Sequence, residues 1–396
     1  VSAEGTCKER KMSRKSVAVL CVGSSEITAL TGARGVNNSF VFKGIHTEKY
    51  DGYADAQFFD PSGLKSAVFS ALEHMEVSCG AKTKKIYVGV PGEFVTVVTK
   101  RHLISFQRKR RIVPSDIDVL YRNGFEENRH GEFIRRGSIY FVTSDKRRII
   151  DPVGMVSDSL EGYLSYFYAD PRFTELFRNI MAEYGIHKVE FLPVSLAEAL
   201  YLIPSEVRDE YAILLDIGYM SMTFGIVCGN GVVFQRSASV GGGHVAAHMI
   251  EDIDIPFEAA EAILKKVNLS STDVEGSVIE YSDKEETYSV PAAKVKEKVK
   301  EGLDIICEAV NSCLAQSGGR YTEYKPVLLT GEGVTSIRGA REHISGRLNK
   351  VVEILAPRLP YYNKPAQSSL LSILDMALRT EGEQSFIHKL FYGFGG

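Results

Sequence analysis

The sequence predicts an α/β fold made of two related halves. Three apolar strands ending in small-residue turns carry this prediction: VAVLCVGSSEITAL (Val17–Leu30), AILLDIGYMSMTFGIV (Ala212–Val227) and VLLTGEGV (Val327–Val334). Glycine in such turns lets backbone N–H groups approach phosphate oxygens, because it has no side chain to block them. The first two segments share one order: an apolar strand, a glycine, a hydroxyl-bearing turn and a second apolar strand. A duplicated domain with a hairpin phosphate loop would leave this pattern.

The overall composition excludes several classes of protein. The chain has 396 residues, is 44% hydrophobic and carries a net charge of −3, so no global field favours nucleic acid. We find no run of 18 apolar residues and no apolar signal-peptide region, so we expect neither a transmembrane helix nor secretion. The six cysteines form no CxxC pair, which fits reduced thiols in a cytoplasmic protein.

Hydrophobic periodicity predicts the elements of the first half. Strands and helices alternate here, as expected for the α/β class. In order, we expect strands over 16–50 with a turn at 31–38, a helix over 60–79, paired strands over 84–106, a helix over 116–123 capped by Ser115, a strand over 137–142, a glycine-containing connection over 152–161, a strand over 160–168, a helix over 170–184, a strand over 188–192 and a helix over 195–201.

The second half continues this alternation and ends in an apolar tail. After the second glycine strand we expect a hairpin at Asn230-Gly231, a helix opened by VGGGH (240–244), a helix over 257–267, a polar irregular stretch over 270–290, a long helix over 290–317 interrupted at Gly302, and helices over 337–349 and 367–378. A polar break is expected at 381–384. The tail SFIHKLFYGFGG follows, and its apolar residues are Phe386, Ile387, Leu390, Phe391 and Phe394.

In their order and spacing, these segments resemble the actin-like ATPase superfamily, and within it the FtsA family of bacterial cell-division proteins. VGSSEITALTG is similar to the first phosphate loop, VEFLPVSLAEAL to the segment before the second, and VLLTGEGV to the adenosine loop. KKIYVGVPGEFVTVV and IIDPVGMVSDSLEG resemble the start and exit of the FtsA-specific inserted subdomain. VGGGHVAAHMIEDIDIPFEAAEAILKK resembles the connecting and nucleotide-binding helices. The resemblance spans residues 16–378. It implies an actin-like (ribonuclease H-like) two-lobed fold with an FtsA-type inserted subdomain.

The resemblance also implies a domain organisation. We expect a disordered N-terminal segment (1–15), a first actin-like lobe (16–82 with 163–205), the inserted subdomain (83–162), a second lobe (206–245 with 320–380), the outer subdomain of that lobe (246–319) and a tail (381–396) that could target a membrane.

A site for ATP or ADP with magnesium between the two lobes is a further implication of the resemblance. No catalytic residue is assigned. The implied nucleotide-binding residues are Gly23, Ser24 and Ser25 at the terminal phosphates, Asp216 at the magnesium ion or its water, Gly218, Tyr219 and Met220 in the second loop, Gly241, Gly242 and Gly243 as backbone donors, Glu258, Glu261 and Lys265 near the ribose and base, and Gly331, Glu332 and Gly333 at the nucleoside.

Several positions depart from the pattern of the family. The departures are Cys21 in place of aspartate, Glu26 in place of lysine, Tyr219 and Met220 in place of glycines, Thr223 in place of aspartate and Glu332 in place of glycine. A thiol cannot replace a carboxylate as a magnesium ligand, and a glutamate near a triphosphate is repelled by it. Since phosphoryl transfer depends on positioning and charge neutralisation, we predict weak or absent ATP hydrolysis and weak or absent nucleotide binding.

Some of these side chains have simpler interpretations. Asp216 could accept backbone hydrogen bonds at a strand end, and Glu258 and Glu261 could form a solvated helix face. His244 and His248 lie four residues apart, but without an HExxH motif we do not expect them to bind a metal.

The resemblance implies an FtsA-like scaffold that links a division filament such as FtsZ to the membrane, at the inner face of which it would be peripheral. The C-terminal peptide of FtsZ would bind at 246–319, and the inserted subdomain would serve self-association into filaments and the binding of other division proteins. Membrane affinity from a short tail would be small, although a polymer multiplies it by avidity; otherwise the tail docks on its own body or a partner. Two alternatives stay open: a PilM-like peptide-binding adaptor of type IV pilus assembly, and a small-molecule kinase of the same superfamily.

Overall fold

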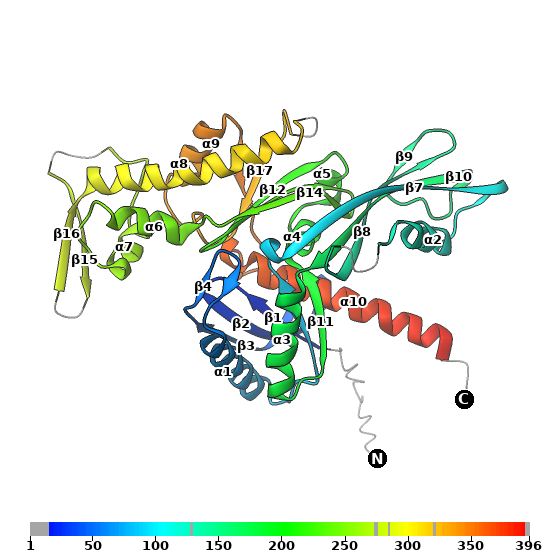
Figure 1. The fold of residues 1–396 in the computed structure, drawn as a ribbon, viewed down its shortest axis with the longest axis horizontal. Helices are drawn as coiled ribbons and strands as arrows, with labels where there is room; N and C mark the ends of the chain where they lie inside the picture. The colour runs from blue at the N-terminus through cyan, green and yellow to red at the C-terminus, as the bar shows by residue number, and fades with distance from the viewer. Residues whose placement is uncertain (1–15, 127–129, 273–275, 284–285, 320–321, 393–396) are drawn as a thin grey trace, which may run out of the picture.

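The body of the protein contains two five-stranded sheets that share one strand topology (Figure 1). The structure is a computed structural model that describes residues 16–126, 130–272, 276–283, 286–319 and 322–392. In each sheet three consecutive strands pair antiparallel, and two later strands add in parallel beside the first of them. The first sheet has the order β11-β6-β1-β2-β3, with β1 (Val17–Val22), β2 (Glu26–Arg34), β3 (Phe40–Lys49), β6 (Lys85–Val90) and β11 (Lys188–Pro193). The second has the order β14-β13-β12-β17-β18, with β12 (Ala212–Ile217), β13 (Met222–Cys228), β14 (Gly231–Ala238), β17 (Val327–Thr330) and β18 (Val352–Ile354). The predicted α/β fold with two related halves is therefore confirmed.

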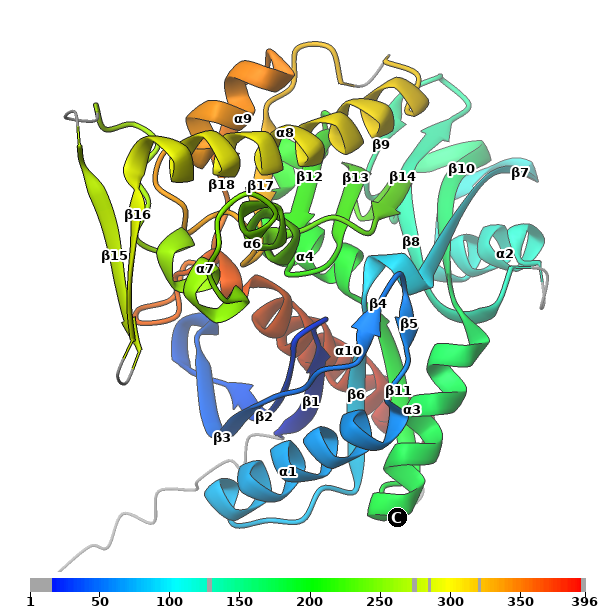
Figure 2. The same ribbon diagram turned by 60° about the vertical axis from the view of Figure 1, so that its left-hand side comes forward.

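Helices cover both faces of the first sheet (Figure 2). Helices α1 (Pro61–Cys79) and α3 (Pro171–Tyr184) each follow an aspartate and a proline, and each ends at a glycine with positive φ. The Asp60 carboxylate accepts the Gly63 N–H at 2.9 Å, and the Asp170 carboxylate accepts the Arg172 N–H at 2.9 Å, as N-caps do. These two helices lie on one face, and α10 (Ser368–Tyr392) crosses the other. The helices predicted over 60–79 and 170–184 are confirmed.

The second sheet is covered in the same way. Helices α6 (Gly242–Ile250), α8 (Ala292–Gln316) and α9 (Ala340–Leu348) share one core with the odd-numbered residues of β12, while α4 (Val194–Leu202) packs on the even-numbered ones. The predicted interruption of the long helix at Gly302 is wrong, because α8 is continuous. A Cβ at Gly302 would lie 3.1 Å from the Val245 Cα, so this glycine lets α6 and α8 approach closely. The short helices α5 (Ser205–Arg208) and α7 (Phe257–Leu264) complete this lobe.

A separate four-stranded sheet stands at the side of the two lobes (Figure 1). Its order is β7-β10-β8-β9, with β7 (Val95–Arg111), β8 (Glu132–Thr143), β9 (Arg148–Ile149) and β10 (Val156–Ala169), and α2 (Pro114–Gly124) packs on it. The predicted insert spans 83–162, but β6 pairs with β1 in the first sheet and β10 pairs with β7 as far as Ala169, so the separate sheet starts only at Val95 and ends at Ala169. The predicted cap at Ser115 is also wrong, because α2 begins at Pro114 with Val113 as its N-cap, and Asp116 accepts the Val113 N–H at 2.9 Å. The rest of the predicted domain division stays a prediction, and residues 1–15 lie outside the described residues.

The stretch over 270–290, predicted to be irregular, contains a hairpin instead. Strands β15 (Val278–Asp283) and β16 (Glu286–Pro291) pair antiparallel at the outer end of the second lobe. Tyr281 and Tyr288 stack directly opposite each other, with ring centroids 6.4 Å apart. Cross-strand aromatic pairs of this kind stabilise a hairpin although the sequence around them is polar.

The polar break predicted at 381–384 is wrong, because α10 continues without interruption to Tyr392. Its polar residues make interior contacts: Thr380 and Glu381 are buried, and the Glu381 carboxylate accepts hydrogen bonds from Lys85 and Tyr87 of β6 at 2.6 and 2.8 Å. The predicted tail residues Phe386, Ile387, Leu390 and Phe391 therefore lie on a helix, and Phe394 lies outside the described residues. Within the described part of the chain, no helix is long and hydrophobic enough to cross a membrane.

Candidate functional site

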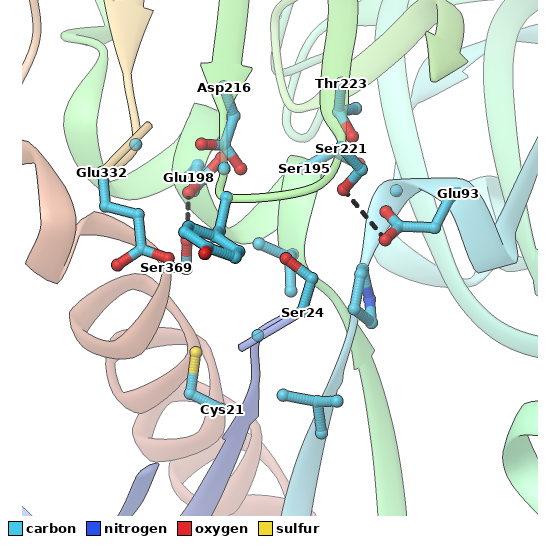
Figure 3. Close-up of a pocket in the computed structure, with 18 of the residues that line it drawn as sticks. Cys21, Ser24, Glu93, Ser195, Glu198, Asp216, Ser221, Thr223, Glu332 and Ser369 are labelled. Carbon is cyan, nitrogen blue, oxygen red and sulfur yellow. Dashed lines mark hydrogen bonds between the residues drawn. The ribbon is translucent and has the colours of Figure 1, made fainter. Parts of the chain in front are cut away.

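The carboxyl ends of the parallel strands of the two sheets face each other across a cavity of about 110 Å³. This is where open α/β sheets usually bind ligands. Cys21 at the end of β1 and Asp216 at the end of β12 point toward the same space from opposite lobes (Figure 3). The cavity is small, since ligand pockets usually measure about 300–1,000 Å³.

The structure brings together about half of the predicted nucleotide-binding residues. Those that line the cavity are Gly23, Ser24, Asp216, Gly218, Tyr219, Gly331 and Glu332. Those that do not line it are Ser25, Met220, Gly241, Gly242, Gly243, Glu258, Glu261, Lys265 and Gly333. The three glycine segments thus meet at one place, while the predicted ribose and base contacts lie outside the cavity.

The two predicted phosphate loops are hydrogen-bonded to each other. The Met220 N–H of the second loop donates to the Ser24 hydroxyl oxygen of the first at 3.0 Å. Each loop is also closed internally, because the Gly23 N–H donates to the Glu26 carbonyl at 2.9 Å and the Gly218 N–H to the Ser221 carbonyl at 2.8 Å. A serine hydroxyl therefore takes a backbone donor that a phosphate oxygen would need.

The amides at the start of α6 are also used within the protein. The Gly242 N–H donates to the Gly218 carbonyl at 3.0 Å, and the Gly243 N–H donates to the Tyr219 carbonyl at 2.8 Å. The Gly241 N–H donates to His244 Nδ1 at 3.2 Å. A Cβ at Gly243 would lie 3.0 Å from the Tyr219 ring, so this ring rests directly on the helix terminus that would otherwise attract an anion.

Carboxylates rather than cations surround the cavity. Glu26, Glu93, Glu198, Asp216 and Glu332 line it, and among the described residues no lysine or arginine does. Burial, together with the charge of Asp216, raises the pKa of Glu198, whose carboxylate accepts the Ser369 hydroxyl at 2.7 Å. Burial and Glu93 raise the pKa of Asp216, and burial raises the pKa of Glu332 to about 7, with Glu26 and Asp216 contributing. On the other side of the cleft, Ser221 donates to Glu93 at 3.0 Å (Figure 3).

These residues do not fit a magnesium nucleotide. The cavity is small, its rim amides are bonded to the protein, and its charge repels a polyphosphate. The site that would hold the metal contains Asp216, whose raised pKa disfavours the ionised form that magnesium needs, and Cys21, whose thiol pKa burial raises far above its ordinary range. We therefore assign no chemical step to this cleft.

Removing the Glu332 charge should stabilise the protein at alkaline pH. The folded-state pKa of about 7 lies above the ordinary 4.5, so the stability linked to this proton is fully present below about pH 4.5 and is lost as pH rises through 7. We expect Glu332→Gln to exceed the wild type by roughly 2 kcal/mol in free energy of unfolding at about pH 8, and to match it at about pH 4. Urea unfolding followed by circular dichroism at both pH values measures this difference.

The matched control is Glu342→Gln. Glu342 is exposed and its hydrogen bond to Arg341 lowers its pKa, so its removal should not stabilise the protein at high pH. If the difference in free energy of unfolding between Glu332→Gln and the wild type does not change with pH, burial and neighbouring charges do not raise the pKa of Glu332.

The sequence prediction missed several residues of the cavity. Glu93 follows β6, and Ser195 and Glu198 follow β11. Both strands are parallel strands whose carboxyl ends point at the cleft, so the topology of the sheet could have indicated them. His244 and His248, which were not expected to bind a metal, contact Gly241 and the carboxylates of Glu251 and Glu301 respectively.

Comparison with known proteins finds similarity to two kinds of protein, PilM and FtsA. A family model described as type IV pilus assembly protein PilM matches residues 189–371. The cell division protein FtsA of Helicobacter pylori strain 26695 is 22% identical over 275 residues, covering 67% of this chain and 54% of the relative. FtsA of Streptococcus pneumoniae strain D39 is 21% identical over 248 residues, covering 62% and 54%. The chain thus spans about half the length of the curated relatives it matches.

Solved structures agree on the fold. The PilM–PilN type IV pilus biogenesis complex contains a chain with a TM-score of 0.61 at 11% identity, covering 92% of this chain and 99% of that one. MreB5 of Spiroplasma citri bound to ADP has a TM-score of 0.53 at 12% identity, covering 93% and 98%. The ethanolamine utilization protein EutJ of Carboxydothermus hydrogenoformans has a TM-score of 0.52 at 14% identity, covering 91% and 89%. At these identities the comparison shows the actin-like fold alone.

Proposed function

We propose that this chain, an FtsA- and PilM-like protein with the actin-like ATPase fold, is an adaptor that joins a bacterial assembly to the membrane without using ATP. The leading form of the proposal is an FtsA-like division scaffold at the inner face of the cell membrane, with an FtsZ-type filament as its partner. The relatives named FtsA support this form. Filament formation and membrane association belong to the proposal.

The main support for the absence of an ATP cycle is that the two predicted phosphate loops are hydrogen-bonded to each other. The Met220 amide is bonded to Ser24, the amides of Gly242 and Gly243 are bonded to the second loop, and five carboxylates line the remaining space. Fold and activity are separable, because activity depends on the site. A small-molecule kinase would need the phosphate contacts that this cleft lacks.

Calorimetric titration of the full chain with ATP and with ADP, each with and without magnesium, tests this proposal. We expect no saturable binding at nucleotide concentrations up to about 1 mM, which corresponds to a binding free energy weaker than about −4 kcal/mol. Magnesium-dependent binding of ATP or ADP in the micromolar range would contradict the proposal that the cleft is closed to nucleotides. Release of phosphate in the presence of any acceptor would revive the kinase alternative.

The partner of the FtsA-like form can be tested directly. A synthetic C-terminal peptide of FtsZ should bind the chain, and the same peptide with a scrambled sequence should not. Binding that persists after the second-lobe region 246–319 is altered at its exposed residues would place the peptide elsewhere, contrary to the expected location. Co-sedimentation with anionic vesicles, with and without the segment after Gln384, measures the membrane contribution separately.

A second candidate, a PilM-like peptide-binding adaptor, is favoured by a groove of about 770 Å³ between α2, α4, α10 and the four-stranded sheet. The Phe125 and Phe133 rings pack edge to face in this groove, with their centroids 5.1 Å apart, and the two residues are 41% and 38% exposed. Arg122, Arg135 and Arg136 also line it. An extended peptide with apolar and acidic residues matches such a surface. The family model and the PilM–PilN structure support this candidate.

Substitution in the groove distinguishes the two forms of the adaptor. If a PilN-type membrane partner supplies the peptide, Phe125→Ala should weaken its binding by about tenfold or more, as expected for an aromatic anchor. Val153→Ala is the control, since Val153 is equally exposed at 43% but lies outside the groove. Unchanged binding of the peptide to Phe125→Ala would remove the groove from the proposal.

A further inference from the structure

Strand β3 and helix α1 approach each other unusually closely on the outside of the first lobe. A Cβ at Gly44 would lie 2.4 Å from the Met75 carbonyl oxygen, so only a glycine allows this spacing. His46 and Glu48 follow Gly44 on the same strand, and because alternate residues share a face, both point toward α1. His74 lies beside Met75 on α1, within reach of both.

Three potential metal ligands converge here. One nitrogen of each imidazole and one carboxylate oxygen of Glu48 lie within 4.8 Å of one another. Glu48 Oε1 is 2.8 Å from His46 Nε2 and 3.8 Å from His74 Nδ1. A tetrahedral zinc centre with bonds of about 2.0–2.2 Å spaces its ligand atoms about 3.3–3.6 Å apart, and the two distances lie on either side of that range. The three side chains are 30–58% exposed, which leaves a path for an ion.

We propose that His46, Glu48 and His74 form a binding site for Zn²⁺ on the outer face of the first lobe. Two imidazoles and one carboxylate are an established zinc ligand type, and water or a partner side chain completes the fourth position. Magnesium and calcium are poor candidates, because they require mostly oxygen ligands. None of the three residues lines the cleft between the lobes, so this site is independent of the nucleotide question.

Ser70 is a positioning residue for this site. It lies one helical turn before His74, and its hydroxyl donates to Glu48 Oε1 at 2.6 Å while its carbonyl oxygen lies 2.9 Å from His74 Nδ1. Zinc-binding carboxylates are usually hydrogen-bonded by a second residue, as Glu48 is by Ser70. His74 Nδ1 is also the nitrogen that lies 3.8 Å from Glu48 Oε1, so an ion bound between them replaces the carbonyl as the partner of this nitrogen.

The test is a calorimetric titration of the tag-free full chain with Zn²⁺, repeated with Co²⁺ while the visible absorption of a four-coordinate cobalt centre is recorded. We expect one equivalent with a Kd of about 10 μM or tighter. His46→Ala and His74→Ala should each weaken binding by at least tenfold, and Ser70→Ala by about tenfold, the range seen for residues that orient a ligand. Mg²⁺ should give no signal.

Matched controls separate this site from other zinc ligands of the chain. His187→Ala removes an exposed histidine elsewhere, and Glu73→Gln removes an exposed carboxylate next to His74; both should bind zinc like the wild type. Glu48→Gln, in contrast, should lose affinity, and circular dichroism verifies that each variant is folded. The proposal is overturned if no saturable equivalent binds, if His46→Ala and His74→Ala bind like the wild type, or if the cobalt spectrum shows thiolate charge transfer.

Discussion

Gly242→Ala is expected to destabilise the protein by about 3 kcal/mol or more in free energy of unfolding, although it adds a single methyl group. A Cβ at Gly242 would lie 2.2 Å from the Gly333 carbonyl oxygen and 2.6 Å from the Gly333 Cα. These are backbone atoms, which cannot rotate away as a side chain can. Gly333 is itself fixed by its N–H, which donates to the Ile217 carbonyl at 2.8 Å. The methyl group must therefore push α6 away from the third glycine loop. Urea unfolding followed by circular dichroism measures the loss.

Gly346→Ala is the matched control for this prediction. Gly346 lies within α9, and a Cβ there would meet nothing within 4 Å. Because alanine is more favourable than glycine inside a helix, this variant should gain roughly 0.5–1 kcal/mol in free energy of unfolding. Equal stabilities for the two variants would mean that α6 and the third loop are not held together as tightly as the structure indicates.

The second large effect is expected at Asp375, which attaches α10 to the first sheet. The Asp375 side chain is 4% exposed, and its carboxylate pairs with Arg34 of β2 and, at 2.6 Å, with Nε of Arg379. Asp375→Asn removes the negative charge that lies between two guanidinium groups. Breaking a buried ion pair in this way typically costs several kcal/mol, and we expect a loss of about 3 kcal/mol in the free energy of unfolding. Hydrogen exchange should show faster exchange of the α10 amides in the variant.

An exposed ion pair serves as the comparison for Asp375. Lys65 and Glu183 lie 3.0 Å apart and are 42% and 58% exposed, so Glu183→Gln should change stability by less than about 0.5 kcal/mol. A similarly small effect of Asp375→Asn would show that hydrophobic contacts alone hold α10 in place.

Much of the fold follows from local sequence signals. Paired patterns such as Asp60-Pro61 with Gly80, and Asp170-Pro171 with Gly185, define helix ends through interactions within a single turn. The three glycine segments could be assigned to one site because each closes a strand. The β15–β16 hairpin was missed because its support is the opposite placement of Tyr281 and Tyr288, which depends on register rather than on composition.

The site itself was only partly predictable, for a physical reason. The family pattern places Ser24, Gly218 and Gly242 near phosphates. Ser24 and Gly218 do line the cavity, and the Gly242 N–H donates to the Gly218 carbonyl beside it. Whether an amide there is open or already bonded depends on distances between segments about 200 residues apart in the sequence. Position 381 shows the same limit: a glutamate that looks like a polar break is instead buried against Lys85 and Tyr87.

The unbroken course of α10 has a geometric consequence for whatever follows it. A helix of 25 residues is about 37 Å long, and this one is anchored over its first half while its last turns extend beyond the first lobe (Figure 1). Along such a rod, one inserted residue advances everything beyond it by about 1.5 Å and rotates it by about 100°. Seven inserted residues advance it by about 10 Å but restore nearly the original direction. The phase of this helix, as well as its length, therefore sets which way its far end faces.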